Sequence, residues 1–168
     1  MERPGATTFK GSPLTLIGPE LRPGDPAPDF EAVDKTLSPV SLGPGGKVRI
    51  FSVVPSLDTP VCDMQTKRFN DELANLDNID VITVSMDLPF AQARWCNAMG
   101  VDRVQMVSDH RTGSFGMAYG TLIKEWRMES RALFVVDKDN VIRYAEYVPE
   151  VSEHPNYEAA LAAAKAAV

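Results

Sequence analysis

Hydrophobic and polar positions follow one another in patterns that predict short strands separated by helices. Two runs rich in β-branched residues, at residues 47–55 and 79–86, are bounded by turn-forming residues and predict central strands buried on both faces. A shorter run at residues 104–109 predicts a third strand. Residues 131–148 contain two such runs around an Asp-Lys-Asp-Asn turn, which predicts an antiparallel hairpin.

Apolar residues at helical spacing predict helices between and after these strands. The first helix should run from residue 60 to about residue 76, and the second should lie within residues 88–100, with a proline in its first turn and Gly100 as its stop. Residues 113–120 predict a short helix flanked by glycines, and a last helix follows His154. Its buried face should consist of Tyr157, Leu161, Ala164 and Val168.

The N-terminal region is rich in proline and glycine. Residues 7–17 predict a β-hairpin appended to the main domain, and a Pro-rich connection follows and ends at Phe30. Residues 29–34 and 39–42 are weaker strand candidates. The order strand-helix-strand-helix-strand, then hairpin and helix, predicts one domain over residues 1–168, a three-layer α/β domain with a mixed sheet.

Composition narrows the possible functions. The 168 residues include 44% hydrophobic and 24% charged residues, which is typical of a globular protein. The net charge of −6 and the lack of a Lys/Arg cluster argue against a nucleic-acid partner. No apolar stretch is long enough to span a bilayer, and the first residues lack the pattern of a secretory signal. We therefore expect a cytoplasmic protein without a membrane partner.

The chain has two cysteines, Cys62 and Cys96, which is too few for a disulfide scaffold. Together with His110 and His154 they are the only soft metal ligands, and none are paired at metal-binding spacing. We therefore expect no metal site and no cofactor. In a reducing compartment such cysteines are buried or redox-active.

The stretch PSLDTPVC places Cys62 at the start of the first predicted helix. Thr59 is a good N-cap residue and Pro60 suits the first helical position, so Cys62 is the third helical residue. Free backbone N–H groups and the helix dipole favour the thiolate there. The carboxylate of Asp63 works against this effect.

The sulfur of Cys62 should point into the domain. Cys62, Phe69, Leu73 and Leu76 recur at helical spacing and mark one face. A thiolate at the end of an apolar stripe needs a nearby cation, and the pattern alone does not name one. The alternative, an inert cysteine packed in the core, remains open at this point.

The motif Pro-x-x-x-Thr-x-x-Cys, which follows a buried strand and opens a helix, resembles the active-site signature of the peroxiredoxins. Four further segments resemble the thiol peroxidase branch of that family, in which atypical two-cysteine members dominate: TTFKGSPLTLIG, RPGDPAPDF, FAQARWC and RALFVVDKDNVI. The resemblance covers most of the chain. It implies a thioredoxin-like three-layer α/β/α fold and the reduction of hydrogen peroxide and organic hydroperoxides.

The resemblance also implies roles for five residues. Cys62 matches the peroxidatic cysteine and Thr59 the hydroxyl that hydrogen-bonds the sulfur and the peroxide. Pro55 matches the proline that shields the thiolate, and Arg131 the arginine that stabilises it. Cys96 matches the resolving cysteine, which forms a disulfide with Cys62 that thioredoxin reduces. A homodimer is a further implication, with loops near residues 59, 94 and 119 as candidates for its interface.

Cys96 lies in the second predicted helix, at the edge of a face that we expect to be buried. That face should comprise Ala91, Trp95, Ala98 and Met99. Two helices on one sheet should hold their cysteines farther apart than the roughly 7 Å that a disulfide tolerates. We therefore expect local unwinding around both cysteines when the disulfide forms.

Two alternatives to a peroxidase remain open. A thiol–disulfide oxidoreductase on the same fold is disfavoured because the chain has no Cys-x-x-Cys motif. A redox-sensing domain would use the disulfide to alter a binding surface instead.

Overall fold

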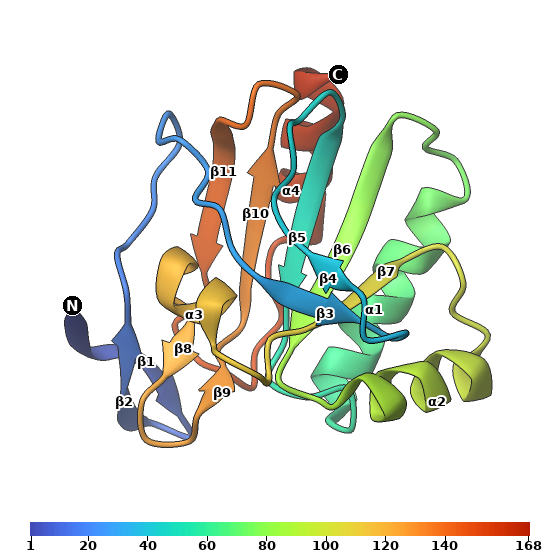
Figure 1. Ribbon diagram of the computed structural model, residues 1–168. Coiled ribbons are helices and arrows are strands. Elements are labelled where there is room, and N and C mark those ends of the chain that lie inside the picture. Colours follow the sequence, from blue (N-terminus) through green and yellow to red (C-terminus); the bar gives the residue numbers. More distant parts are fainter.

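The computed structural model describes residues 1–168 and contains a seven-stranded mixed sheet (Figure 1). The strands follow the order β11-β10-β5-β6-β7-β3-β4. The neighbours β5, β6 and β7 are parallel, whereas the other pairs are antiparallel. The bounds are β3 (Ala32–Asp34), β4 (Pro39–Val40), β5 (Val48–Val53), β6 (Ile79–Ser85), β7 (Gln105–Ser108), β10 (Ala132–Val136) and β11 (Ile142–Tyr147).

Helices cover both faces of this sheet, which confirms the predicted three layers (Figure 1). The helices are α1 (Pro60–Leu73), α2 (Pro89–Met99), α3 (Ser114–Tyr119) and α4 (Tyr157–Ala167). Residues of α1, α2 and α4 share one hydrophobic cluster with the sheet, and α3 belongs to the cluster on the opposite face. None of the helices has the length and apolar character that a membrane crossing requires.

The central strand β5 shows why these residues form a buried strand. All six of its residues are buried, as predicted for a strand covered on both faces. Val48 and Ile50 face the cluster beneath α1 and α4, whereas Phe51 and Val53 face the cluster beneath α3. The cluster beneath α1 and α4 includes Cys62, so the start of α1 packs against this core.

The predicted faces of α1 and α4 differ from those in the structure at the C-terminal ends of these helices. Helix α1 ends at Leu73, three residues earlier than predicted, because the next backbone N–H groups donate to carbonyls three residues back. Leu76 is only partly buried beyond the helix end. In α4, Leu161 and Ala164 are buried as expected, but Val168 is 57% exposed because it follows the last helical residue.

The N-terminal hairpin belongs to a second, four-stranded sheet in the order β1-β2-β8-β9. It starts five residues before the predicted hairpin, and its turn places Lys10 and Gly11 at φ 48° and 81°. Strands β8 and β9 were not predicted, because two-residue strands leave no periodic pattern. The bounds are β1 (Glu2–Phe9), β2 (Ser12–Ile17), β8 (Leu122–Ile123) and β9 (Met128–Glu129).

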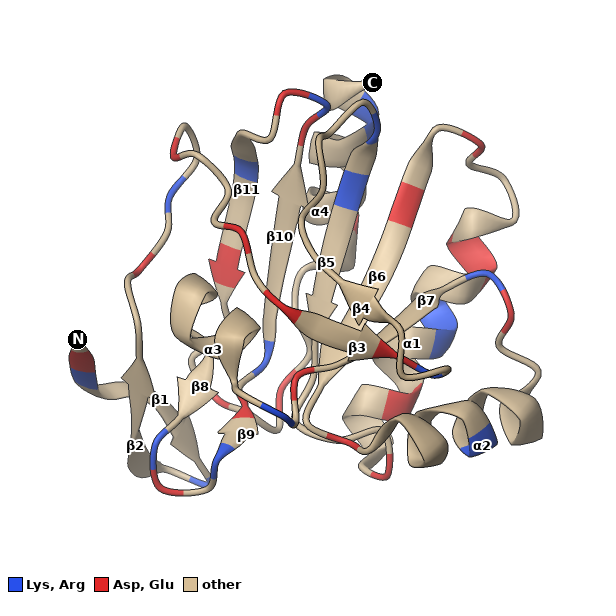
Figure 2. Ribbon diagram, in the orientation of Figure 1, with Lys and Arg blue, Asp and Glu red and all other residues tan.

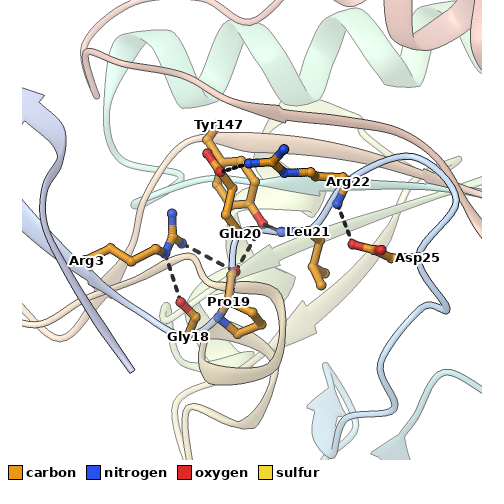
Figure 3. Close-up of polar contacts among 8 residues, drawn as sticks. All are labelled: Arg3, Gly18, Pro19, Glu20, Leu21, Arg22, Asp25 and Tyr147. Atoms are coloured by element: carbon orange, nitrogen blue, oxygen red, sulfur yellow. Dashed lines mark hydrogen bonds and ion pairs between the residues drawn. The ribbon is translucent and has the colours of Figure 1, made fainter.

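Polar contacts of Arg3 and Tyr147 fasten the hairpin and the following segment to the body (Figure 3). The Arg3 guanidinium donates to the Gly18 carbonyl at 2.8 Å and lies 5.2 Å from the centre of the Tyr147 ring. The Tyr147 hydroxyl accepts from the Leu21 N–H at 2.9 Å and donates to the Tyr119 carbonyl at 2.7 Å. Burial raises the pKa of Tyr147 to about 12, so the phenol remains a donor.

Candidate active site

Cys62 lies in the first turn of α1, as predicted from the cap and the proline. Thr59 is the N-cap residue, Pro60 begins the helix, and Cys62 is fully buried. Its sulfur accepts a hydrogen bond from the Nη2 atom of Arg131 at 3.2 Å. The cation that a buried thiolate requires is therefore present, and it comes from the residue that immediately precedes β10.

Arg131 gives the strongest electrostatic evidence at the site, because the residue is 2% exposed and its guanidinium forms no salt bridge. Its Nε atom donates to the Val151 carbonyl at 2.8 Å, and Nη1 donates to Oε1 of Gln65 at 3.0 Å. Both partners are neutral. A buried charge without a counter-ion is costly, and the sulfur of Cys62 is the contacting group that can carry the compensating negative charge.

Gln65 holds the guanidinium in place, and the sequence reasoning missed it. It is fully buried one helical turn after Cys62. Its Nε2 atom donates to the hydroxyl of Ser52 on β5 at 2.8 Å, which orients Oε1 toward Arg131. The spacing of three residues places Gln65 on the face of Cys62, so helical periodicity would have flagged it as a buried polar residue.

Thr59 occupies the N-cap position without capping the helix. Its hydroxyl instead donates to the Ser56 carbonyl at 3.0 Å, and no side chain bonds the first N–H groups of α1. These N–H groups remain available as donors beside the sulfur. Asp63, expected to oppose a thiolate, pairs with Lys67 at 2.9 Å, which offsets its charge.

A cavity of about 290 Å³ adjoins the site. Three of the residues predicted for the site, Pro55, Thr59 and Arg131, line it together. Its apolar wall comes from the second sheet and includes Phe9 and Trp126, whose rings pack edge-to-face at 5.1 Å. The N-terminal hairpin, predicted as an appendage, therefore contributes directly to this cavity.

Cys96 lies near the end of α2 and is 5% exposed. The buried face of α2 consists of Pro89, Gln92, Trp95 and Cys96. The predicted face was wrong, because its members Ala91, Ala98 and Met99 are exposed and only Trp95 is buried. The polar residue Gln92 takes the central place, since its amide donates to the Ser85 hydroxyl and the Val107 carbonyl.

The two cysteines are free thiols within the same hydrophobic cluster. Burial raises the pKa of the Cys96 thiol, which has no hydrogen-bonding cation. Helix α2 is almost free of charged residues (Figure 2), and its one charged residue is Arg94. The structure therefore joins Cys62, Arg131, Thr59 and Pro55 in one site and holds Cys96 apart as a neutral thiol.

Comparisons with known proteins identify the family of the chain. The sequence model of the redoxin family matches residues 22–161. A thiol peroxidase from Halalkalibacterium halodurans is 54% identical over 162 residues, which cover 96% of this chain and 98% of the relative. A thiol peroxidase from Bacillus subtilis is 55% identical over 162 residues, with coverage of 96% and 97%.

Solved structures show the same fold. A peroxiredoxin-like protein from Aquifex aeolicus superposes with a TM-score of 0.92 at 40% identity, covering 98% of both chains. A thiol peroxidase from Chromobacterium violaceum, at 23% identity, shares the fold with a TM-score of 0.82 over 91% of both chains. The chain therefore belongs to the redoxin family and, within it, to the thiol peroxidase branch of the peroxiredoxins.

Proposed function

We propose that the chain reduces hydroperoxides, with Cys62 as the attacking thiolate and Arg131 as its counter-ion. The observation that carries the proposal is the buried guanidinium of Arg131, whose contacting groups other than the sulfur are neutral. A protein gains nothing in stability from such an unpaired cation. The buried guanidinium of Arg131 is explained if the Cys62 sulfur is an anion that pairs with it and reacts.

The first step is a displacement at oxygen. The Cys62 thiolate attacks one peroxide oxygen, the O–O bond breaks, and the other oxygen leaves as water or an alcohol after taking a proton. Arg131, Thr59 and the free N–H groups of α1 provide polar contacts for the two oxygens in the transition state. Pro55, which lines the cavity, limits the access of water to the sulfur.

The second step joins the two cysteines. The sulfenic acid on Cys62 condenses with the thiol of Cys96 to form a disulfide, and one water leaves. Because both thiols are buried in different helices, we propose that the first turn of α1 and the end of α2 unwind. Thioredoxin, as an external dithiol, then reduces the disulfide and restores both thiols.

The apolar wall of the cavity supports organic hydroperoxides as substrates in addition to hydrogen peroxide. Phe9, Trp126 and Met128 form a surface on which an alkyl group can pack while the peroxide reaches the polar end at Thr59 and Arg131. We accordingly expect a lower KM for an alkyl hydroperoxide than for hydrogen peroxide.

We further propose that residues 1–168 form one domain. We also propose that the protein is cytoplasmic and that two copies of the chain form a homodimer. The start of α2 supports an interface close to the active-site loop, because Leu88 and Phe90 are 54% and 68% exposed. In the candidate loop near Tyr119, the side chain of Tyr119 is itself buried, so neighbouring residues would form any contact made there.

The decisive experiment measures peroxide consumption coupled to the oxidation of reduced thioredoxin. The wild-type chain should turn over hydrogen peroxide and an alkyl hydroperoxide, and Cys62→Ser should show no turnover with either. Full activity of Cys62→Ser would refute the proposal. Disulfide reductase activity without peroxide would instead support a thiol–disulfide oxidoreductase.

The unwinding step has its own test in amide hydrogen exchange. Residues 60–66 and 96–100 should lose protection when the disulfide forms, because both helix ends must open to join the sulfurs. Identical protection in the reduced and oxidised proteins would contradict this step and leave the peroxidase activity itself unaffected.

A further inference from the structure

Asp87 lies outside the thiol site, between β6 and α2, and binds the loop that carries Thr59. Its Oδ1 atom accepts from the Ser56 hydroxyl at 2.8 Å. Its Oδ2 atom accepts from the Leu57 N–H at 2.9 Å and the Ser85 hydroxyl at 2.8 Å. No lysine or arginine pairs with this carboxylate, so its acceptor capacity is directed at the loop and the end of β6.

Ser56 connects this carboxylate to Thr59. The single hydroxyl proton of Ser56 is donated to Asp87, and its backbone carbonyl accepts from both the N–H and the hydroxyl of Thr59, at 3.3 Å and 3.0 Å. The direction of each proton along the path Asp87–Ser56–Thr59 is therefore fixed. Because the Thr59 hydroxyl donates to a carbonyl, its oxygen has lone pairs left to accept from the O–H of a peroxide.

Asp87 is itself held from the sheet. The hydroxyl of Ser108, at the end of β7, donates to the Asp87 carbonyl at 2.6 Å. The Ser108 hydroxyl has only this one proton to donate. In its 2.9 Å contact with Nδ1 of His110, the hydroxyl oxygen must therefore accept, and Nδ1 must carry the proton. The backbone of Asp87 is thus anchored at the ends of the neighbouring parallel strands β6 and β7. The carboxylate can therefore hold the loop in a fixed position.

We propose that Asp87 is a positioning residue for peroxide reduction. By orienting Ser56 and Leu57, it holds the Thr59 hydroxyl where the proton points away from the substrate and the lone pairs face it. This inference rests on the role proposed above for Thr59. It assigns to Asp87 an effect on the oxidation of Cys62 that acts through another residue and involves no contact with substrate.

The variant Asp87→Asn tests this role because an amide has only one acceptor oxygen. If the NH₂ group faces Leu57, the bond from the Leu57 N–H is lost, since both groups are donors. If it faces Ser56, the Ser56 hydroxyl must reverse and accept, so the direction of its proton is no longer fixed, and the charge-assisted character of every bond is lost. The matched control is Asp58→Asn in the same loop. Asp58 is exposed, and its carboxylate makes no hydrogen bond, so the control removes the same charge without removing a contact.

The experiment is a double-mutant cycle on the second-order rate constant for oxidation of Cys62 by hydrogen peroxide in a single turnover. Asp87→Asn should lower this constant by about tenfold to a hundredfold, as expected for the loss of hydrogen bonds to a charged group. Asp58→Asn should stay within about twofold of wild type, since exposed charges are well screened. In a Thr59→Val background, Asp87→Asn should have little further effect.

Thermal unfolding of all variants separates positioning from stability. Equal rate losses from Asp87→Asn with and without the Thr59 hydroxyl would overturn the proposal, because a merely structural residue acts independently of that group. A wild-type rate for Thr59→Val would overturn both the role of Thr59 and the inference, whereas the peroxidase function is judged separately by Cys62→Ser. If Asp87→Asn fails to fold, Ser56→Ala removes the Oδ1 contact, together with the 3.3 Å bond from the Asp58 N–H, and must show the same dependence on Thr59.

Discussion

Cys62 and Cys96 are buried to nearly the same degree in one hydrophobic cluster, yet the charges and dipoles around the two sulfurs differ. Cys62 lies at a helix N-terminus and receives a hydrogen bond from a guanidinium. Cys96 lies near a helix C-terminus, where its own carbonyl accepts from the Gly100 and Val101 N–H groups and the dipole disfavours an anion. Burial alone therefore does not decide the reactivity of a cysteine.

The two helices that carry these cysteines also differ in their number of charged residues. Helix α1 carries several charged residues of both signs, including the Asp63–Lys67 pair, whereas α2 has one charged residue, Arg94 (Figure 2). This difference supports the proposal that Cys62 attacks the peroxide. Burial raises the pKa of Cys96, which fits the proposal that this thiol stays protonated until it reacts with the sulfenic acid.

The largest expected effect separates the two roles directly. Cys96→Ser should abolish sustained turnover with thioredoxin, because no disulfide can form, but should still consume one equivalent of peroxide per chain. Rapid-quench measurement of peroxide against thioredoxin oxidation distinguishes the burst from turnover. Cys62→Ser is the matched control and should show neither. Sustained thioredoxin-dependent turnover by Cys96→Ser would mean that Cys96 is not the resolving thiol.

The next largest effect concerns the cation. Arg131→Met should lower kcat/KM for peroxide by about a hundredfold to a thousandfold, in line with the removal of one preorganised charged donor. Arg131→Lys keeps the charge but loses the fork that contacts Val151, Gln65 and Cys62, so its loss should be smaller. Equal activity of Arg131→Met and wild type in steady-state assays would break the comparison.

The pH dependence of disulfide closure tests the second cysteine. Because burial raises the pKa of Cys96, its thiolate is scarce at neutral pH and becomes more abundant as pH rises. If the thiolate attacks the sulfenic acid, the closure rate should increase by up to about tenfold per pH unit from neutral pH up to that raised pKa. Stopped-flow fluorescence of the adjacent Trp95 can follow closure. A flat profile would show that deprotonation of Cys96 does not limit this step.

The smallest effect sharpens the comparison at the end of α2. Gly100 has φ 67°, a conformation that favours glycine, and no atom would contact an added Cβ. Gly100→Ala should therefore lower the free energy of unfolding by about 1 kcal/mol through backbone strain alone. Urea unfolding of the reduced protein measures the change. An unchanged or increased free energy of unfolding would contradict the structural role given to this residue.

Sequence patterns predicted the elements that local chemistry specifies. The start of α1 follows from Thr59 and Pro60, and the end of α2 from Gly100, because N-terminal proline and C-terminal glycine act within one turn. The buried strands β5 and β6 follow from their β-branched runs. The resemblance to a known family then named the site residues, three of which share the cavity beside Cys62.

Other features had no local signal. The buried face of α2 was predicted wrongly, because alanine is tolerated on either side of a helix and the amide of Gln92 is satisfied only by partners on β6 and β7. Strands β8 and β9 exist because the N-terminal hairpin pairs with β8. The roles of Gln65 and Asp87 likewise depend on contacts with distant segments.

The sequence by itself determined that Cys62 begins a helix and faces the core, because caps, prolines and apolar periodicity act over a few neighbouring residues. Only the tertiary structure decided the electrostatic surroundings of that sulfur. It brings together Cys62 and Arg131, 69 positions apart, and turns the Thr59 hydroxyl from the helix to the Ser56 carbonyl. These contacts depend on how the sheet aligns its strands and on which buried groups find partners, and no local pattern encodes either.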